Sequence, residues 1–259
     1  MQASKYCDVT GLVGIACGRH GCYVPQTLLD LIKGEQQKNM DFGLLRAVIS
    51  TGVTREQGLL FIYDIACQYM VHLQERISTS LPFGLDIEGA IGLFHVHAHK
   101  DQCFYRYATS FIPGAGIVAG EILESLWSSL NSISPTARTA TLAHRAEMLD
   151  DHATDSNHKK CLGMVSSLCR SYRLAADMLD HAKPYYQNLT VQAGKTAIEK
   201  WSSDIKAAER NRKYDVTAMD IYAAKLPNSH LDTRHPEPGR PTTPLASWME
   251  LSLTVEEKQ

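Results

Sequence analysis

A short apolar run that ends in a carboxylate constrains the fold of this chain more than any other feature. Residues 59–63 read Leu-Leu-Phe-Ile-Tyr, and Asp64 follows them directly. An apolar run of this length is typical of a strand buried in a sheet. We therefore predict a buried strand over residues 59–66 that delivers Asp64 to the sheet edge, although an aspartate in this position is also common as a helix cap or turn residue.

Two more carboxylates lie in an apolar helical pattern farther along the chain. Glu121 and Glu124 interrupt the otherwise apolar segment 120–128. Because residues three apart share one face of a helix, the two side chains can point the same way. Oxygen ligands of this kind suit a divalent metal ion. The sequence thus predicts a metal site made by Asp64 and one of the two glutamates, the other being an exposed helix charge.

The apolar pattern changes near residue 113. Before it, short runs alternate with helical segments, which indicates an α/β layer, and after it the pattern is almost wholly helical. We expect an α/β fold in three parts: an α/β core over 1–112, a helical region over 113–225 and a Pro-rich, disordered tail over 226–259. The expected elements are strands over 11–17, 21–25, 59–66 and 87–97, helices within 25–49 and 68–78, and helices near 116–131, 139–151, 156–182 and 189–224, with breaks at Pro113, Pro135 and Pro184.

The composition is that of an ordinary soluble protein. Hydrophobic residues make up 44% of the chain and charged residues 21%, and the formal charge of −2 provides no global positive field for nucleic acid. The best local candidate for a DNA contact is the basic stretch 195–213, although a solvated helix face is the more common explanation of such a stretch. No bilayer-length apolar run and no signal-peptide pattern occur, and seven cysteines, an odd number, favour a reducing compartment. We expect a soluble intracellular protein.

Histidine and cysteine side chains gather in two parts of the sequence. On a strand over 87–97 the alternation would project His95 and His97 from one face, with His99 continuing the phase. Together with the nearby cysteines these residues are sufficient for a tetrahedral zinc site, although core histidines and buried free thiols are the more common explanation of such a pattern. The candidate zinc ligands are Cys17, His20, Cys22, His95, His97, His99 and Cys103.

Five ordered motifs resemble the Kyakuja-Dileera-Zisupton (KDZ) transposases. They are Gly11 to Gly21, Lys33-Gly34-Glu35, Tyr63 to Tyr69, Gly92 to Cys103 and Gly120 to Trp127. The resemblance extends from about residue 8 to about residue 157, and more loosely to the C-terminus. It implies an RNase H-like fold and a DDE-type nuclease and strand transferase, in which three carboxylates hold two Mg²⁺ or Mn²⁺ ions that cleave and join DNA.

The resemblance also assigns roles to single residues. It makes Asp64 the second carboxylate of the triad and Glu124 the third, because Glu124-Ser-Leu-Trp-Ser is similar to the signature that closes the catalytic domain of the related hAT transposases. Glu121 remains the alternative, one helical turn away. Cys67 and His72 are similar to the Cys/His motif that follows the second aspartate in hAT-like transposases, where it supports the active site or the DNA end.

The family's first catalytic aspartate lies on a strand upstream of the segment that begins near Asp8. We therefore expect this chain to lack that carboxylate and to be an inactive remnant of a transposase. The alternative is a non-catalytic DNA- or protein-binding module derived from one, and a Cys-His hydrolase is a third interpretation that the sequence supports less. The resemblance further implies that the protein lies in the nucleus, binds DNA and can form homo-oligomers.

Overall fold

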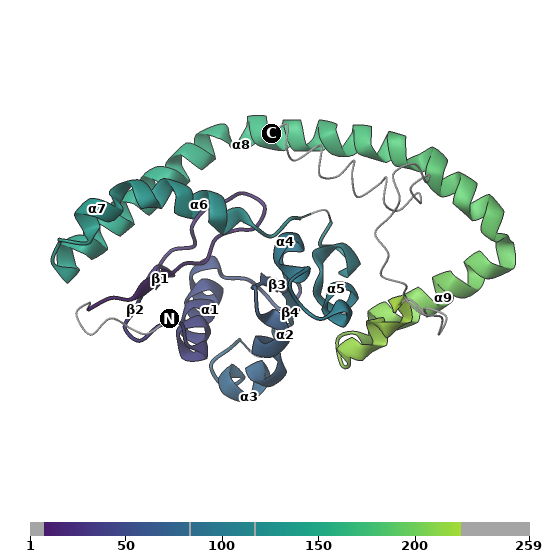
Figure 1. The fold of residues 1–259 in the computed structure, drawn as a ribbon, viewed down its shortest axis with the longest axis horizontal. Coiled ribbons are helices and arrows are strands. Elements are labelled where there is room, and N and C mark those ends of the chain that lie inside the picture. The colour runs from purple at the N-terminus through teal and green to yellow at the C-terminus, as the bar shows by residue number, and fades with distance from the viewer. Residues whose placement is uncertain (1–7, 83, 117, 224–259) are drawn as a thin grey trace, which may run out of the picture. The chain divides into compact units, whose positions relative to one another are not determined.

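The structure is a computed structural model that describes residues 8–82, 84–116 and 118–223 (Figure 1). The chain divides into two units, residues 1–223 and 224–259, and the expected Pro-rich tail lies outside the described residues. The first unit is a mixed α/β fold, as the sequence predicts, and its described strands form two small sheets. None of its described helices combines the length and the apolar character that crossing a membrane requires.

The first sheet is an antiparallel pair made by β1 (Gly11–Val13) and β2 (Leu29–Leu31). The expected strands over 11–17 and 21–25 are therefore wrong in extent. Only an isolated bridge joins Ala16 to Tyr23, around a turn in which Gly21 has φ +68°. The pairing of β1 with β2 is favoured because Val13, Leu29 and Leu31 pack into one core and the Thr10 hydroxyl donates to the carbonyl of Leu31, whereas residues 18–20 of the turn are exposed.

Helix α1 (Gln37–Thr51) begins later than the sequence suggested, because β2 occupies part of the segment 25–36. It buries one stripe of residues spaced three and four apart, and it ends at Gly52, whose φ of +62° is the left-handed conformation that favours glycine at a helix end. The buried residues of this stripe are Met40, Gly43, Leu44, Ala47 and Val48.

The second sheet pairs β3 (Leu59–Ile62) with β4 (Ile87–Ala90) in parallel, with Phe61 opposite Gly89. The strand expected over 59–66 is thus confirmed, but it is shorter. The helix expected over 68–78 is divided into α2 (Ala66–Tyr69), the 3-10 turn η1 (Met70–His72) and α3 (Leu73–Ile77), and it connects the two parallel strands. The fully buried Leu44, Tyr69 and Leu73 lie at the centre of the core.

The strand expected over 87–97 is wrong in its second half. β4 ends at Ala90, and the chain turns at Gly92 into the short helix α4 (Leu93–Val96). The N–H of Leu93 donates to the carbonyl of Ala119 at 2.7 Å, so a loop from far along the chain takes the hydrogen bond that a strand would need. The chain then forms α5 (Asp101–Tyr107) and η2 (Thr109–Phe111).

The remaining described chain is helical, as expected, but its breaks differ. α6 (Ile122–Leu130), η3 (Asn131–Ile133) and α7 (Ser134–Ala137) precede α8 (Leu142–Ala193), α9 (Lys195–Asn211) and η4 (Val216–Tyr222). The two helices expected over 139–151 and 156–182 are one continuous helix. The break expected at Pro184 is wrong, because this proline lies inside α8; the break falls at Gly194, whose φ is +78°. A proline removes one helical hydrogen bond, and a long helix can continue past that loss.

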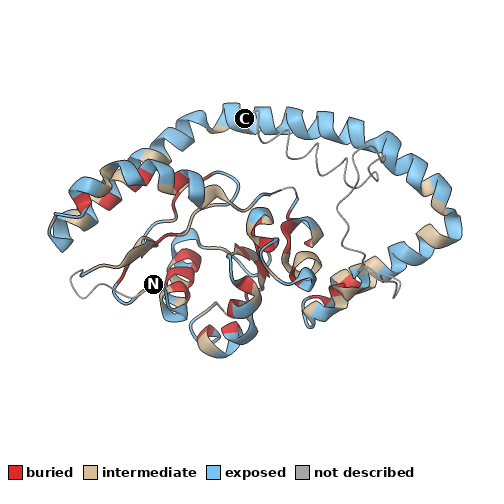
Figure 2. Cartoon of the chain, in the orientation of Figure 1, coloured by how far each residue is buried: buried red, intermediate tan, exposed pale blue. Residues whose placement is uncertain are grey.

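Helix α8 contacts the α/β core near its beginning. Leu149 and Ala153 are its two buried residues, and the Asn157 side chain bonds both backbone groups of Tyr23, at 2.7 Å and 2.9 Å. Arg145 forms an ion pair with Asp30 of β2 at 3.0 Å. Most of the helix beyond this part is exposed (Figure 2).

The segment that follows α8 contacts the core again. Arg212, whose side chain is only 4% exposed, forms an ion pair with Glu88 of β4, and Lys213 pairs with Asp86 at 2.7 Å. Arg106 of α5 makes two hydrogen bonds to the carboxylate of Asp220 in η4. Two cations of the basic stretch 195–213 are therefore bound to carboxylates of the core and contribute less to any DNA contact.

Candidate metal site

Asp64 lies just beyond the end of β3, as the sequence predicts. The neighbouring Tyr63 still donates its N–H to Ala90 of β4 at 2.9 Å, so the strand pair fixes the backbone one residue before the aspartate. The Asp64 side chain is 61% exposed and is free to accept a ligand. On the other side of the backbone the Tyr63 hydroxyl donates to Glu35; burial, and then this carboxylate, raise the pKa of Tyr63.

The imidazole of His95 lies between two carboxylates. Its Nδ1 is 2.8 Å from Oε2 of Glu121 and 3.7 Å from Oδ1 of Asp64. The two carboxylate oxygens are therefore no farther apart than the sum of these distances, although their residues are far apart in the sequence. His95 is on α4, Glu121 is the residue that precedes α6, and Asp64 follows β3, so three separate segments converge here.

Two glycines permit Glu121 to approach this point. A Cβ at Gly92 would lie 2.2 Å from Oε1 of Glu121, and a Cβ at Gly120 would lie 2.9 Å from the Cα of Gly92. Gly120 also has φ +86°, which a residue with a side chain rarely adopts. The same Oε1 accepts a hydrogen bond from the N–H of Phe94 at 3.1 Å. The carboxylate of Glu121 is thus fixed by backbone contacts on one side and by His95 on the other.

Glu124 occupies the first turn of α6 and is exposed. It lines the same cavity as Asp64, His95 and Glu121, but the contacts of His95 are with Asp64 and Glu121. Sequence reasoning preferred Glu124 and kept Glu121 as the alternative. The signal that distinguishes them is Gly92, where the backbone comes close to the Glu121 side chain, together with Gly120, which lies against Gly92.

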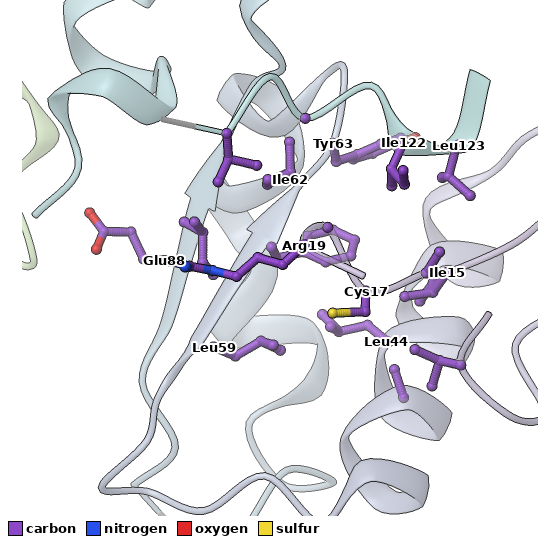
Figure 3. A pocket seen from close by; sticks show the side chains of 18 of the residues that line it. Ile15, Cys17, Arg19, Leu44, Leu59, Ile62, Tyr63, Glu88, Ile122 and Leu123 are labelled. Carbon is purple, nitrogen blue, oxygen red and sulfur yellow. The ribbon is translucent and has the colours of Figure 1, made fainter. Parts of the chain in front are cut away.

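A large cavity runs along β3 beside this cluster. Its volume is about 960 Å³, and it is lined by β3, by the stretch Leu12–Arg19 and by the buried face of α1 (Figure 3). The Arg19 side chain lies across it and donates to the carbonyl of Ala115 at 3.1 Å. In the described part of the chain β4 is the only strand that pairs with β3, and residues 59–64 line this cavity.

The candidate zinc ligands do not share one site. Cys67, His99 and Cys103 come together, with ligand atoms all within 4.8 Å of one another and Cys67 Sγ 3.5 Å from His99 Nδ1. Burial raises the pKa of the Cys67 thiol, and the adjacent Cys103 raises it further. His97 packs instead against the ring of Phe104, with centroids 5.4 Å apart.

The expectation that His95, His97 and His99 share one strand face is therefore wrong, because the segment is a helical turn rather than a strand. Cys17 Sγ lies 3.3 Å from His20 Nδ1, in the turn between the first two strands. Burial raises the pKa of the nearby Cys22, as does Cys161 of α8. His72, which the sequence paired with Cys67, contacts Glu75 at 3.1 Å.

Comparison with known proteins gives one match. No curated protein matches the chain, and no solved structure matches it. The family model of the Kyakuja-Dileera-Zisupton transposase matches residues 1–157, which include both strand pairs, Asp64, His95 and Glu121. Because this match covers more than half of the chain, the protein belongs to the KDZ transposase family.

Proposed function

We propose that this protein is a DDE-type transposase component in which Asp64 and Glu121 are the second and third metal-binding carboxylates. The observation that supports the proposal is the position of His95 Nδ1 within 3.7 Å of Asp64 and 2.8 Å of Glu121. A ring nitrogen occupies the place between two carboxylates where a cation would lie. The exposure of Asp64 and the fixed orientation of Glu121 fit a site that receives an ion from solvent.

The chemistry follows from the donor set. Mg²⁺ takes oxygen ligands at about 2.0–2.1 Å, so both carboxylates would bind one ion if His95 moved aside and their oxygens came within about 4 Å of each other. Bound there, the ion would polarise a DNA phosphate and activate the attacking hydroxyl group. Asp64 and Glu121 would hold it, and His95, hydrogen-bonded to Glu121, would orient that carboxylate.

A two-metal site requires a third carboxylate between the ions, which these two residues do not supply. The open edge of β3 and the cavity beside it are suited to a further strand in an RNase H-like sheet. We propose that the third carboxylate reaches the site on such a strand, and that this chain by itself binds one ion weakly and does not cut DNA. DNA as the substrate and the nucleus as the location are proposals that follow from the family.

Metal binding and DNA nicking test this proposal separately. Titration with Mn²⁺ should detect one weak site, and Asp64→Asn and Glu121→Gln should each weaken it at least about tenfold, since each removes a charged ligand. Glu124→Gln is the matched control, one turn along and exposed, and it should bind Mn²⁺ like the parent protein. Loss of binding in Glu124→Gln but not in Glu121→Gln would exchange the two roles. Metal-dependent nicking that Asp64→Asn abolishes would show that the chain alone is active.

A non-catalytic binding module is the alternative function. It is favoured by the extensive exposed surface of α8, which the proposed metal site does not use. A chain that binds transposon-end or partner molecules equally well with and without Mg²⁺, and regardless of Asp64→Asn, would support this alternative.

We further propose that Cys67, His99 and Cys103 bind a zinc ion. Two sulfurs and one imidazole nitrogen, all within 4.8 Å of one another, match the ligand types of tetrahedral zinc, with a water molecule as the fourth ligand. Cys67 follows Asp64 by three residues, and His99 follows His95 by four. A zinc ion here would therefore connect the two segments that carry Asp64 and His95.

Elemental analysis tests the zinc site independently of the catalytic proposal. The purified chain should retain about one zinc per molecule, and Cys67→Ser and Cys103→Ser should each lose it, whereas Cys169→Ser on the exposed face of α8 should keep it. Substitution with Co²⁺ gives a second measurement on the parent protein, because two thiolates produce an intense charge-transfer absorption. A protein free of zinc, or an unchanged Co²⁺ spectrum in Cys67→Ser, would rule the site out.

A further inference from the structure

Helix α8 carries a regular apolar stripe that, apart from Cys161 beside Cys22, its contacts with the core do not use. We name this stripe the seam and define it by ten residues whose spacing alternates between four and three without exception. They are Cys161, Val165, Leu168, Tyr172, Ala175, Leu179, Ala182, Tyr186, Leu189 and Ala193. An alternation of three and four is the heptad pattern of a coiled coil.

The seam is open to solvent. Its first nine residues are exposed, with Val165 at 73%, Tyr172 at 77% and Tyr186 at 68%, and Ala193 is half-buried. At 1.5 Å per residue the seam is about 50 Å long. An exposed apolar stripe of this length marks an interaction surface, because isolated helices gain most of their stability by burying such a face. Pro184 lies on the opposite side of the helix and does not interrupt it.

We propose that the seam binds the seam of a second copy of this chain in an antiparallel coiled coil. The order of large and small residues specifies this arrangement. With the two-fold axis level with Asp177, Tyr172 of one copy faces Ala182 of the other, and Leu179 faces Ala175. Tyr186 then faces Leu168, Val165 faces Leu189, and Cys161 faces Ala193. Every facing pair joins the two different seam positions of the heptad, as antiparallel helices require.

A parallel arrangement fits the same residues poorly. In register, it would place Tyr172 against Tyr172 and Ala182 against Ala182, which gives one overfilled layer and one empty layer. The charges favour the antiparallel arrangement as well. Arg173 would lie almost level with Asp180 of the other copy and on the same side of the dimer, whereas the parallel arrangement would place like charges at the same level.

The buried area is adequate for a stable dimer. Tyr172 and Tyr186 contribute four tyrosines to the pair of seams, and an aromatic side chain buries about 150–250 Å². The tyrosines alone would therefore bury roughly 600–1,000 Å², about half of the 1,200–2,000 Å² typical of a specific interface. The leucines and Val165 supply the remaining area. Because both copies use the same surface, the interface has two-fold symmetry, closes at the dimer and does not extend into filaments.

The mass in solution tests the association. Light scattering at micromolar concentration should give twice 28.8 kDa for the parent protein. Leu179→Asp should raise the dimer dissociation constant at least about tenfold. Leu174→Asp is the matched control, because Leu174 is also exposed on α8, at 49%, but lies off the seam, and it should leave the dimer intact. A monomeric parent protein, or equal weakening by both variants, would overturn the proposal.

Cross-linking tests the orientation. In a background with Cys161→Ser and Cys169→Ser, chains carrying Val165→Cys are mixed with chains carrying Leu189→Cys and treated with a short thiol linker. The antiparallel seam predicts a covalent heterodimer on mixing and little cross-linking of either chain alone. Efficient cross-linking of the Val165→Cys chain with itself would establish the parallel arrangement. A second outcome is a monomer in which the thiol introduced by Val165→Cys reacts only after residues 224–259 are removed, and it would show that this segment covers the seam. Parallel cross-linking and this second outcome would each overturn the proposal.

Discussion

Helices α1 and α8 are both regular, but they bury very different shares of their residues. α1 buries five of its 15 residues, all on one stripe against the sheets, whereas α8 buries two of its 52. The position of α1 is therefore determined by packing against the core. The position of α8 is determined by its first turns, by its own backbone hydrogen bonds and, if the seam is an interface, by a second copy. A regular helix in the structure is thus no measure of how much tertiary packing stabilises it.

The largest expected difference between these helices is in the loss of stability when an apolar side chain is truncated. Leu44→Ala in α1 removes a side chain that is 1% exposed, and it should lower the free energy of unfolding by about 3–5 kcal/mol. Leu189→Ala in α8, where the side chain is 64% exposed, should change it by less than about 0.5 kcal/mol in dilute, monomeric protein. Urea unfolding measures both. Equal losses would mean that α8 is packed against the chain more closely than its exposure indicates.

The next difference concerns carboxylates. Asp41 of α1 accepts hydrogen bonds from the Tyr69 hydroxyl at 2.7 Å and from two nitrogens of Arg76 at 2.9 Å and 3.1 Å. Asp41→Ala would leave Arg76 without this partner in a half-buried place, and it should cost about 2–3 kcal/mol. On α8 the exposed pair Asp155 and Lys159 should contribute nothing measurable, so Asp155→Ala is the control. Thermal unfolding measures both variants, and equal losses of stability would contradict this view.

Alkaline pH should lower the free energy of unfolding, because the Tyr69 hydroxyl donates a hydrogen bond to Asp41 of α1. Burial, and then the Asp41 carboxylate, raise the pKa of Tyr69 above that of a tyrosine in the unfolded chain. The folded state therefore retains a proton that the unfolded state releases. Stability is complete below about pH 10 and falls as the pH rises further. Tyr69→Phe should show a smaller fall between about pH 10 and pH 12 in chemical unfolding; an identical fall in both proteins would exclude Tyr69 as its cause.

The smallest expected difference is at the glycines within the two helices. A Cβ at Gly163 of α8 meets nothing within 4 Å, so Gly163→Ala should stabilise the protein by about 0.5–1 kcal/mol through helix propensity. A Cβ at Gly43 of α1 would lie 3.4 Å from both Ile15 and Leu29, so the same substitution should gain less or destabilise. Melting temperatures of the two variants provide the test, and a larger gain at Gly43 would contradict the comparison.

The sequence predicted local elements well where the pattern was long or uniform. The apolar run before Asp64 is a strand, and the chain after residue 113 is mainly helical, as expected. The failure at 93–97 has a physical reason. Alternation over a few residues is compatible with both a strand and a single helical turn, and the choice was made by a hydrogen bond from Leu93 to the distant Ala119.

In the candidate site, too, the sequence indicated the residues and the tertiary structure decided their contacts. Sequence reasoning proposed Asp64 with Glu124 and kept Glu121 as the alternative, because residues three apart can share one helix face. The choice that we propose depends on the contact of Glu121 with Gly92 and His95, which pattern and spacing do not encode. Cys67 of α2 likewise meets His99 and Cys103 only because α5 packs against α2.

The amino-acid sequence by itself determined the family motifs, the strand that ends at Asp64, the helical second half and the heptad spacing of the seam, since each depends on residues close together in the chain. Tertiary structure decided which carboxylate lies beside His95, which thiols face His99, and that the seam is exposed. These features depend on contacts between segments tens of residues apart, and such contacts are determined by the packing of the whole core.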